Sequence, residues 1–149
     1  HKAALASMLV SNKNAATLFA SLGVHACTDV TGFGLAGHLS EMLEASNCSA
    51  ELIIQNVPCL KGAIELSNQG ITSSLFPQNY ALIKTLAISE KVKRYANFDL
   101  LFDPQTSGGL LAGVNDVALK KLQAQQEVDF TVIGRVVESN ESDWNLSFI

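Results

Sequence analysis

The stretch from Ala26 to Leu39 constrains the fold of this chain more than any other part of the sequence. It reads ACTDVTGFGLAGHL, and the apolar residues Val24–Cys27 at its start predict a short strand. The three glycines predict a turn, and the amphipathic run after them predicts a helix. A strand that enters a helix through a glycine-rich turn presents free backbone N–H groups at the positive end of the helix, where anions bind.

One carboxylate, Asp29, and two hydroxyls, Thr28 and Thr31, belong to this turn. A carboxylate repels a bare phosphate unless a divalent cation lies between the two groups. Mg²⁺ is typically held by one or two carboxylates together with substrate phosphates. The local chemistry therefore predicts a metal-bridged phosphate site.

A second interpretation of Asp29 stays open, because aspartate before a helix is a common N-cap. The density of glycine and hydroxyl around Asp29 exceeds what a cap requires, which favours the binding site. Gly32 and Gly34 could instead serve turns with positive φ or close helix packing.

A second candidate segment, DPQTSGG, runs from Asp103 to Gly109 between two apolar stretches. Thr106 and Ser107 offer hydroxyls, and Gly108 and Gly109 allow backbone N–H groups to approach a ligand. The alternative is a polar connection whose glycines serve a bulge or a tight turn. The segment does not match the P-loop pattern, which requires Gly-Lys followed by Ser or Thr.

Composition narrows the class of protein. The chain has 149 residues, of which 48% are hydrophobic and 16% charged, and this predicts one folded domain. The net charge of −4 argues against nucleic acid or an anionic membrane as a partner. We find no apolar run of about 18 residues, so a membrane span is not expected. The small basic group Lys91, Lys93 and Arg94 is typical of a solvated face.

Three cysteines, without C-x-x-C spacing, predict neither a disulfide framework nor a zinc site, and they favour a reducing cytoplasm. Cys27 is close to a helix start that could lower its thiol pKa. A small buried core residue is the favoured interpretation, because free cysteine is among the most buried types. His38 shares a helix face with Leu35, Leu39 and Met42, which predicts a buried, hydrogen-bonded histidine.

The pattern along the chain predicts an α+β fold, in which a mixed β-sheet is covered by α-helices. The expected helices are Ala3–Leu22, with a possible second start at Ser11 or Asn12, then Phe33–Ala45, Lys61–Ser67 and Asp116–Gln125. The expected strands are Val24–Cys27, Ala50–Ile54, Phe98–Phe102, Leu110–Val114, Phe130–Val137 and Trp144–Ile149. Gly70–Gln78 is expected to be a loop, and Tyr80–Ile88 is ambiguous between helix and strand.

Both long segments resemble the signatures of the selenophosphate synthetase (selenide, water dikinase) family. Residues 26–39 are similar to that family's A-C-T-D-V-T-G-F-G-L-x-G-H-L motif, and residues 103–111 to its D-P-Q-T-S-G-G-L-L motif. The resemblance covers essentially the whole chain, with further matches at Asn12–Lys13, Ala15–Ala16, Gly23, Glu41–Met42, Asn79 and Ile133–Gly134. It implies the α+β C-terminal domain of the aminoimidazole ribonucleotide synthetase-like superfamily.

The family makes selenophosphate from ATP, selenide and water, leaving AMP and phosphate. Its N-terminal domain carries the reactive cysteine or selenocysteine, and no such segment is present here. The resemblance therefore implies an isolated C-terminal domain with no catalytic residue of its own, inactive by itself, whose partners are its N-terminal domain, ATP and selenide. It also implies a cytoplasmic homodimer for the full-length enzyme.

Asp29 matches a family aspartate that helps to hold Mg²⁺ against the ATP phosphates. By motif position, Thr31, Gly32, Thr106, Ser107, Gly108 and Gly109 line the same cleft. The alternatives are another enzyme of the same superfamily and a non-catalytic module that binds a nucleotide or a partner protein.

Overall fold

The computed structural model describes residues 2–86, 88–138 and 146–149 of the chain. Its α-helices are α1 (Lys2–Met8), α2 (Lys13–Ser21), α3 (Gly34–Ser46), α4 (Ala63–Asn68), α5 (Phe76–Tyr80) and α6 (Asp116–Ala124). Its 3₁₀ helices are η1 (Ile54–Asn56), η2 (Ala81–Thr85), η3 (Val92–Arg94) and η4 (Asp99–Phe102). Its strands are β1 (Ala26–Asp29), β2 (Ser49–Leu52), β3 (Leu110–Gly113), β4 (Gly134–Val137) and β5 (Leu146–Phe148).

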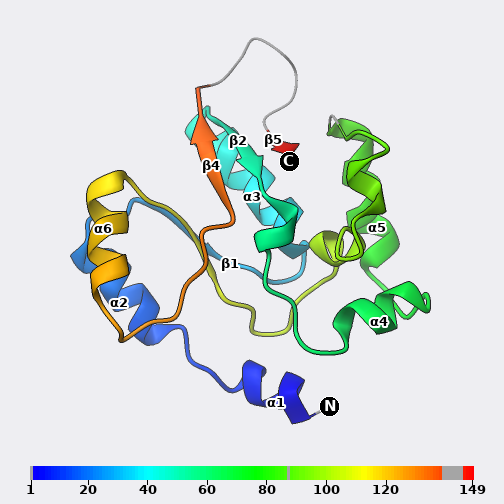
Figure 1. Ribbon diagram of the computed structural model, residues 1–149, viewed down its shortest axis with the longest axis horizontal. Coiled ribbons are helices and arrows are strands. Elements are labelled where there is room, and N and C mark those ends of the chain that lie inside the picture. The colour runs from blue at the N-terminus through cyan, green and yellow to red at the C-terminus, as the bar shows by residue number, and fades with distance from the viewer. Residues whose placement is uncertain (1, 87, 139–145) are drawn as a thin grey trace.

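The α+β class is confirmed, and the described strands form two small sheets. β1 and β3 pair antiparallel as a two-stranded sheet. The other sheet has the order β4-β2-β5, in which β2 is antiparallel to β4 and parallel to β5, so this sheet is mixed. Helix α3 lies against the mixed sheet, α2 and α6 lie together beside β1, and α4 and α5 lie on the opposite side (Figure 1). No helix in the described part of the chain is long and apolar enough to cross a membrane.

The hydrophobic core lies between α3, the mixed sheet and the 3₁₀ segments. Its fully buried side chains include Leu52, Ile54, Leu101 and Leu146. Aromatic rings extend this core: those of Phe98 and Phe102 lie 5.4 Å apart, and Tyr80 contacts Phe102 edge-on at 5.2 Å. This core fixes η4 against α3 and places the start of the second candidate segment.

Several expected elements differ from the structure. The predicted helix Ala3–Leu22 is broken into α1 and α2, and α2 starts after Asn12, as one of the expected second starts indicated. The strand expected at Val24–Cys27 is β1, shifted two residues toward the C-terminus. The loop expected at Gly70–Gln78 ends in the first turn of α5, and the ambiguous Tyr80–Ile88 stretch contains η2.

The strand expected at Phe98–Phe102 is wrong, because these residues form η4 and the turn before it. Phe98, Leu101 and Phe102 are all buried, with spacings of three and four residues that bring one side of a helical turn to the core. The strand expected at Phe130–Val137 is confirmed only from Gly134 onward. Trp144 and Asn145, at the start of the last expected strand, lie outside the described residues, and the strand itself is β5.

Candidate functional site

The antiparallel pairing of β1 with β3 brings the two candidate segments to one end of their sheet. Asp29, the last residue of β1, is opposite Leu110, the first residue of β3. The turn that leaves β1 (residues 30–33, here the first motif loop) therefore meets the segment that enters β3 (residues 103–109, the second motif loop). The structure joins two segments that the sequence shows only separately.

Backbone hydrogen bonds connect the two motif loops directly. The N–H of Val30 donates to the carbonyl oxygen of Gly109 at 3.0 Å, and the N–H of Gln105 donates to the carbonyl oxygen of Thr31 at 2.9 Å. The same Thr31 oxygen accepts the N–H of Gly34 at 3.1 Å, which closes the turn into α3. The loops therefore act as one structural unit.

Two asparagine side chains add to these bonds. Asn12, just before α2, donates through Nδ2 to the carbonyl oxygen of Gly108 at 2.9 Å. Asn79, in α5, donates through Nδ2 to the carbonyl oxygens of Gly32 at 2.8 Å and Phe102 at 3.1 Å. The sequence predicted Asn12 only as a possible start of the second helix, and its side chain makes no capping bond there. It assigned Asn79 no role beyond its place in the family pattern.

Asp29 is exposed, on the same face of β1 as Cys27. The helix that follows has Phe33 at its N-cap position, without a side-chain capping bond. The interpretation of Asp29 as the helix cap is therefore wrong, because β1 extends further than the sequence predicted and Asp29 belongs to the strand. The carboxylate stands at the junction of the two motif loops, where it is open to solvent.

The hydroxyl of Thr31 is partly buried and lies 3.3 Å from Nε2 of His38. His38 is 8% exposed, and its Nδ1 lies 3.4 Å from a carboxylate oxygen of Glu41, one turn further along α3. The prediction of a buried, hydrogen-bonded His38 is confirmed. This contact connects the first motif loop to α3 through the Thr31 hydroxyl, which keeps further hydrogen-bonding capacity.

The glycines of the two loops differ in the space around them. A Cβ on Gly108 would overlap the carbonyl oxygen of Val30, and one on Gly34, where φ is +70°, would lie 2.8 Å from the carbonyl oxygen of Leu101. Gly32 and Gly109 have open space instead. Gly34 and Gly108 are therefore required for close packing. Gly32 and Gly109 instead leave their backbone groups accessible in the two motif loops. Thr106 and Ser107 are also exposed, with Ser107 at a φ of +56°.

Cys27 is exposed, so the interpretation of this residue as a buried core cysteine is wrong. It occupies the outward side of β1, where the alternation along the strand places Cys27 and Asp29 together. Partial desolvation, and secondly the nearby Asp29 carboxylate, raise the pKa of the Cys27 thiol. A thiol with a raised pKa is a weak nucleophile at neutral pH, so an activated Cys27 near the helix start is not supported.

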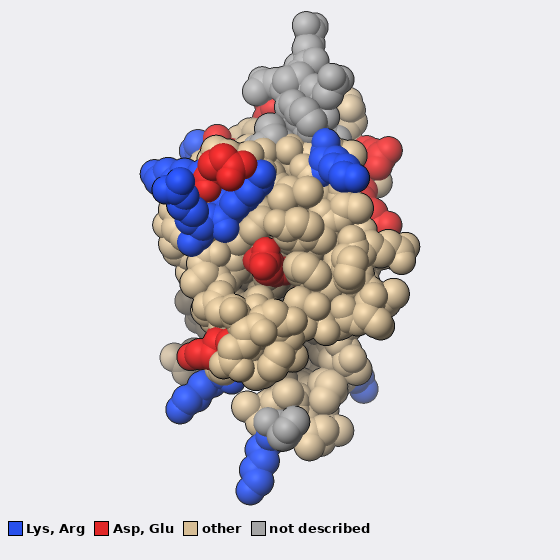
Figure 2. Space-filling model, turned by 90° about the vertical axis from the view of Figure 1, so that its right-hand side faces the viewer, with Lys and Arg blue, Asp and Glu red and all other residues tan. Residues whose placement is uncertain are grey.

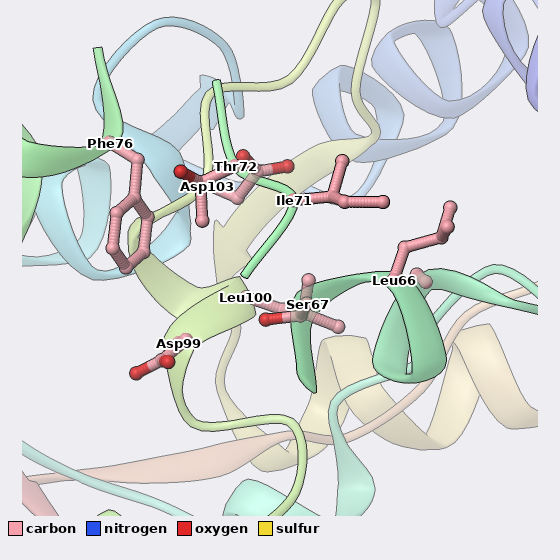
Figure 3. Close-up of a pocket in the computed structure, with 9 residues that line it drawn as sticks. Leu66, Ser67, Ile71, Thr72, Phe76, Asp99, Leu100 and Asp103 are labelled. Atoms are coloured by element: carbon pink, nitrogen blue, oxygen red, sulfur yellow. The ribbon is translucent and has the colours of Figure 1, made fainter. Parts of the chain in front are cut away.

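A cavity of about 170 Å³ lies next to the second motif loop, between α4, the residues before α5, and η4. Asp103, Thr72 and Phe76 are among the residues that line it, and Asp99 extends from η4 (Figure 3). Desolvation raises the pKa of both carboxyls, although hydrogen bonds from Ser73 and Gln105 partly counter this at Asp103. The side of the molecule that carries α4 and α5 is mostly uncharged around one central acidic group, and basic and acidic side chains lie toward its edges (Figure 2).

Within residues 2–86, 88–138 and 146–149, no group of three or more His, Cys, Asp or Glu side chains could hold a metal ion. Asp29 can therefore supply one ligand, and a divalent cation bound there requires oxygens from phosphates or from another polypeptide segment.

A comparison with protein families matches residues 4–145 to the AIR synthase related protein, C-terminal domain. The chain belongs to this family. Its curated relatives include proteins named selenide, water dikinase from Caldanaerobacter subterraneus subsp. tengcongensis (38% identical over 136 residues), Clostridioides difficile (36% over 139) and an Enterobacter species (39% over 127). These alignments cover 89%, 90% and 83% of this AIR synthase related domain, but only 39%, 40% and 36% of the relatives. The chain thus spans about two fifths of the length of these relatives.

Proposed function

We propose that this chain is the C-terminal domain of an ATP-dependent selenide, water dikinase, which makes selenophosphate from ATP, selenide and water and leaves AMP and phosphate. The observation that carries the proposal is the pairing of Asp29 with Leu110, which brings both motif loops to one carboxylate. The relatives named selenide, water dikinase support the choice of reaction, because they align with most of this chain.

In this proposal Asp29 supplies one oxygen ligand to Mg²⁺ bound against the ATP phosphates, and a preceding domain supplies the remaining protein ligands and the nucleophile. Mg²⁺ would neutralise the phosphate charge during transfer. In the same proposal the cleft is lined by Thr31, Gly32, Thr106, Ser107, Gly108 and Gly109. Gly32, Thr106, Ser107 and Gly109 are exposed, while the Thr31 hydroxyl also contacts His38 and Gly108 packs against Val30.

The partners in this proposal are the enzyme's own N-terminal domain, ATP and selenide, and the full-length enzyme is a homodimer. A reducing cytoplasm is the proposed location. The three free cysteines, Cys27, Cys48 and Cys59, support this setting.

The test measures selenide-dependent AMP formation by the full-length enzyme across a Mg²⁺ titration. Asp29→Ala is expected to lower activity by about 100-fold or more, because a metal ligand contributes several kcal/mol of charge stabilisation. Asp129→Asn, a change at an exposed aspartate between α6 and β4, serves as the control and should match wild type. Activity of Asp29→Ala equal to wild type at every Mg²⁺ level would remove Asp29 from the metal site.

A wild-type enzyme that makes no AMP would overturn the dikinase proposal itself. The isolated chain gives a second check, because one carboxylate alone should not fix Mg²⁺–ATP. We expect the purified 149-residue chain to form no AMP from ATP and selenide. Selenide-dependent AMP formation by this chain alone would show that the domain is catalytically complete.

A further inference from the structure

A single side-chain amide, that of Asn79, links the first motif loop to the residue that precedes the second. We propose that Asn79 is a positioning residue for the metal–phosphate cleft, acting through the peptide group that follows Gly32. This inference rests on the proposed dikinase function and deepens it. Asn79 does not touch the reacting groups; it holds the backbone that faces them.

The geometry uses both N–H donors of one amide. Nδ2 of Asn79 lies 2.8 Å from the carbonyl oxygen of Gly32 and 3.1 Å from that of Phe102. Gly32 belongs to the first motif loop, and Phe102 is the last residue of η4, immediately before the second motif loop. Asn79 is half-buried and belongs to α5, so a third segment of the chain holds the two carbonyl groups.

The bond to Gly32 also orients a backbone donor. A peptide group is planar, so a fixed Gly32 carbonyl also fixes the direction of the N–H of Phe33. Among the hydrogen bonds of the described residues, neither the N–H of Gly32 nor that of Phe33 has a protein acceptor. Both residues are exposed, and they immediately precede α3, where N–H groups favour an anion such as phosphate.

Little packs against the side-chain position of Gly32, because apart from its chain neighbours no atom lies within 4 Å of where its Cβ would be. The other links between the motif loops are backbone bonds, from Val30 to Gly109 and from Gln105 to Thr31. These bonds do not depend on Asn79, so they should survive its replacement. Loss of the Asn79 amide is therefore expected to loosen the Gly32 turn while leaving the β1–β3 pairing intact.

The test compares Asn79→Asp and Asn79→Ala with wild type in the full-length enzyme. Asn79→Asp keeps the side-chain shape but replaces two donors with a carboxylate that cannot donate to either carbonyl when ionised. The matched control is Asn14→Asp, the same chemical change at an exposed position on α2. AMP formation is measured against Mg²⁺–ATP concentration, and melting temperature and amide hydrogen exchange are followed on the same samples.

We expect both Asn79 variants to require about tenfold more Mg²⁺–ATP for half-maximal rate, with a smaller change in kcat, because a lost hydrogen bond to the loop weakens binding on this scale. Exchange at the N–H of Gly34, which closes the turn onto Thr31, should accelerate, while exchange in β1 stays protected. Lowering the pH should restore part of the Mg²⁺–ATP affinity of Asn79→Asp, since a protonated carboxyl can donate one hydrogen bond. It should restore none of the affinity of Asn79→Ala.

The outcomes separate the two proposals. Suppose that wild type makes AMP and that both Asn79 variants need the same Mg²⁺–ATP concentration as wild type for half-maximal rate. The positioning role is then overturned, while the dikinase function stands. A lowered melting temperature with unchanged concentration dependence would likewise leave Asn79 a purely structural residue. If wild type makes no AMP, the dikinase function falls, and the positioning role falls with it.

Discussion

Gly108 lies so close to Val30 that a Cβ on the glycine would overlap the carbonyl oxygen of Val30. The two motif loops therefore meet backbone to backbone, with no side chain between them. Nδ2 of Asn12 donates a hydrogen bond to the carbonyl oxygen of the same glycine at 2.9 Å. Both contacts hold the second motif loop against its neighbours at Gly108.

Replacement of Gly108 by alanine should separate the motif loops. We expect Gly108→Ala to lower the free energy of unfolding by about 2–3 kcal/mol, because the backbone of Val30 cannot move aside as a flexible side chain would. Urea denaturation checks this value. Gly109→Ala is the matched control, since open space surrounds the adjacent glycine, and equal losses in the two variants would contradict the packing argument.

Gly34 combines backbone strain with close packing, and a second glycine separates the two effects. Gly34 has a φ of +70° and lies against the carbonyl of Leu101, whereas Gly62 has a φ of +89° in open space. We expect Gly62→Ala to lower the free energy of unfolding by about 1 kcal/mol and Gly34→Ala by clearly more. Chemical denaturation of both variants measures the difference, and a smaller loss at Gly34 would rule out the steric contribution.

The hydroxyl of Thr31 should stabilise the fold through His38. Thr31→Val leaves the buried Nε2 of His38 without its partner, which should lower the free energy of unfolding by about 1 kcal/mol. Thr28→Val is the control, because the Thr28 hydroxyl reaches only the carbonyl oxygen of its neighbour Asp29, at 3.4 Å. Thermal or urea unfolding compares the two, and the hypothesis fails if both variants lose the same stability.

The cavity beside η4 predicts a pH dependence at Asp99. Desolvation raises the pKa of this carboxyl, so the folded protein holds the proton to a higher pH than the unfolded chain does. The contribution of Asp99 to stability therefore falls as the pH rises from the ordinary carboxyl value, about 3.9, through the raised pKa, and it stays low above that.

Asp99→Asn removes this cost, so the variant should melt about 1–2 °C higher than wild type at pH 7, with little difference near pH 3. The effect is small because Asp99 is only partly buried and solvent screens its charge. Melting curves at several pH values check the trend, with the exposed Asp129→Asn as the control. If Asp99→Asn melted at a lower temperature than wild type at pH 7, the expected direction of the effect would be contradicted.

The local pattern of residue types predicted some helices and strands correctly and others incorrectly. The predicted helix Phe33–Ala45 corresponds to α3 within one residue at each end, because a glycine turn precedes it and Asn47, in the left-handed region with a φ of 49°, ends it. The apolar run Phe98–Phe102 was assigned to a strand, since a short apolar run has no clear period. In the structure it is a 3₁₀ helical turn, and the spacing of Phe98 and Phe102 lets both rings pack into the core, against Phe148 and Tyr80.

The sequence by itself determined the chemistry of the two motif loops, the α+β class and the burial of His38, because each depends on residue types at short spacing. Only the tertiary structure decided that the loops meet, through the register of β1 against β3. It also decided that Asp29 belongs to a strand and that Asn12 and Asn79 hold the loops, across sequence separations of 96 and 47 residues. Such distant contacts leave no local periodicity, so they arise only when the core brings the segments together.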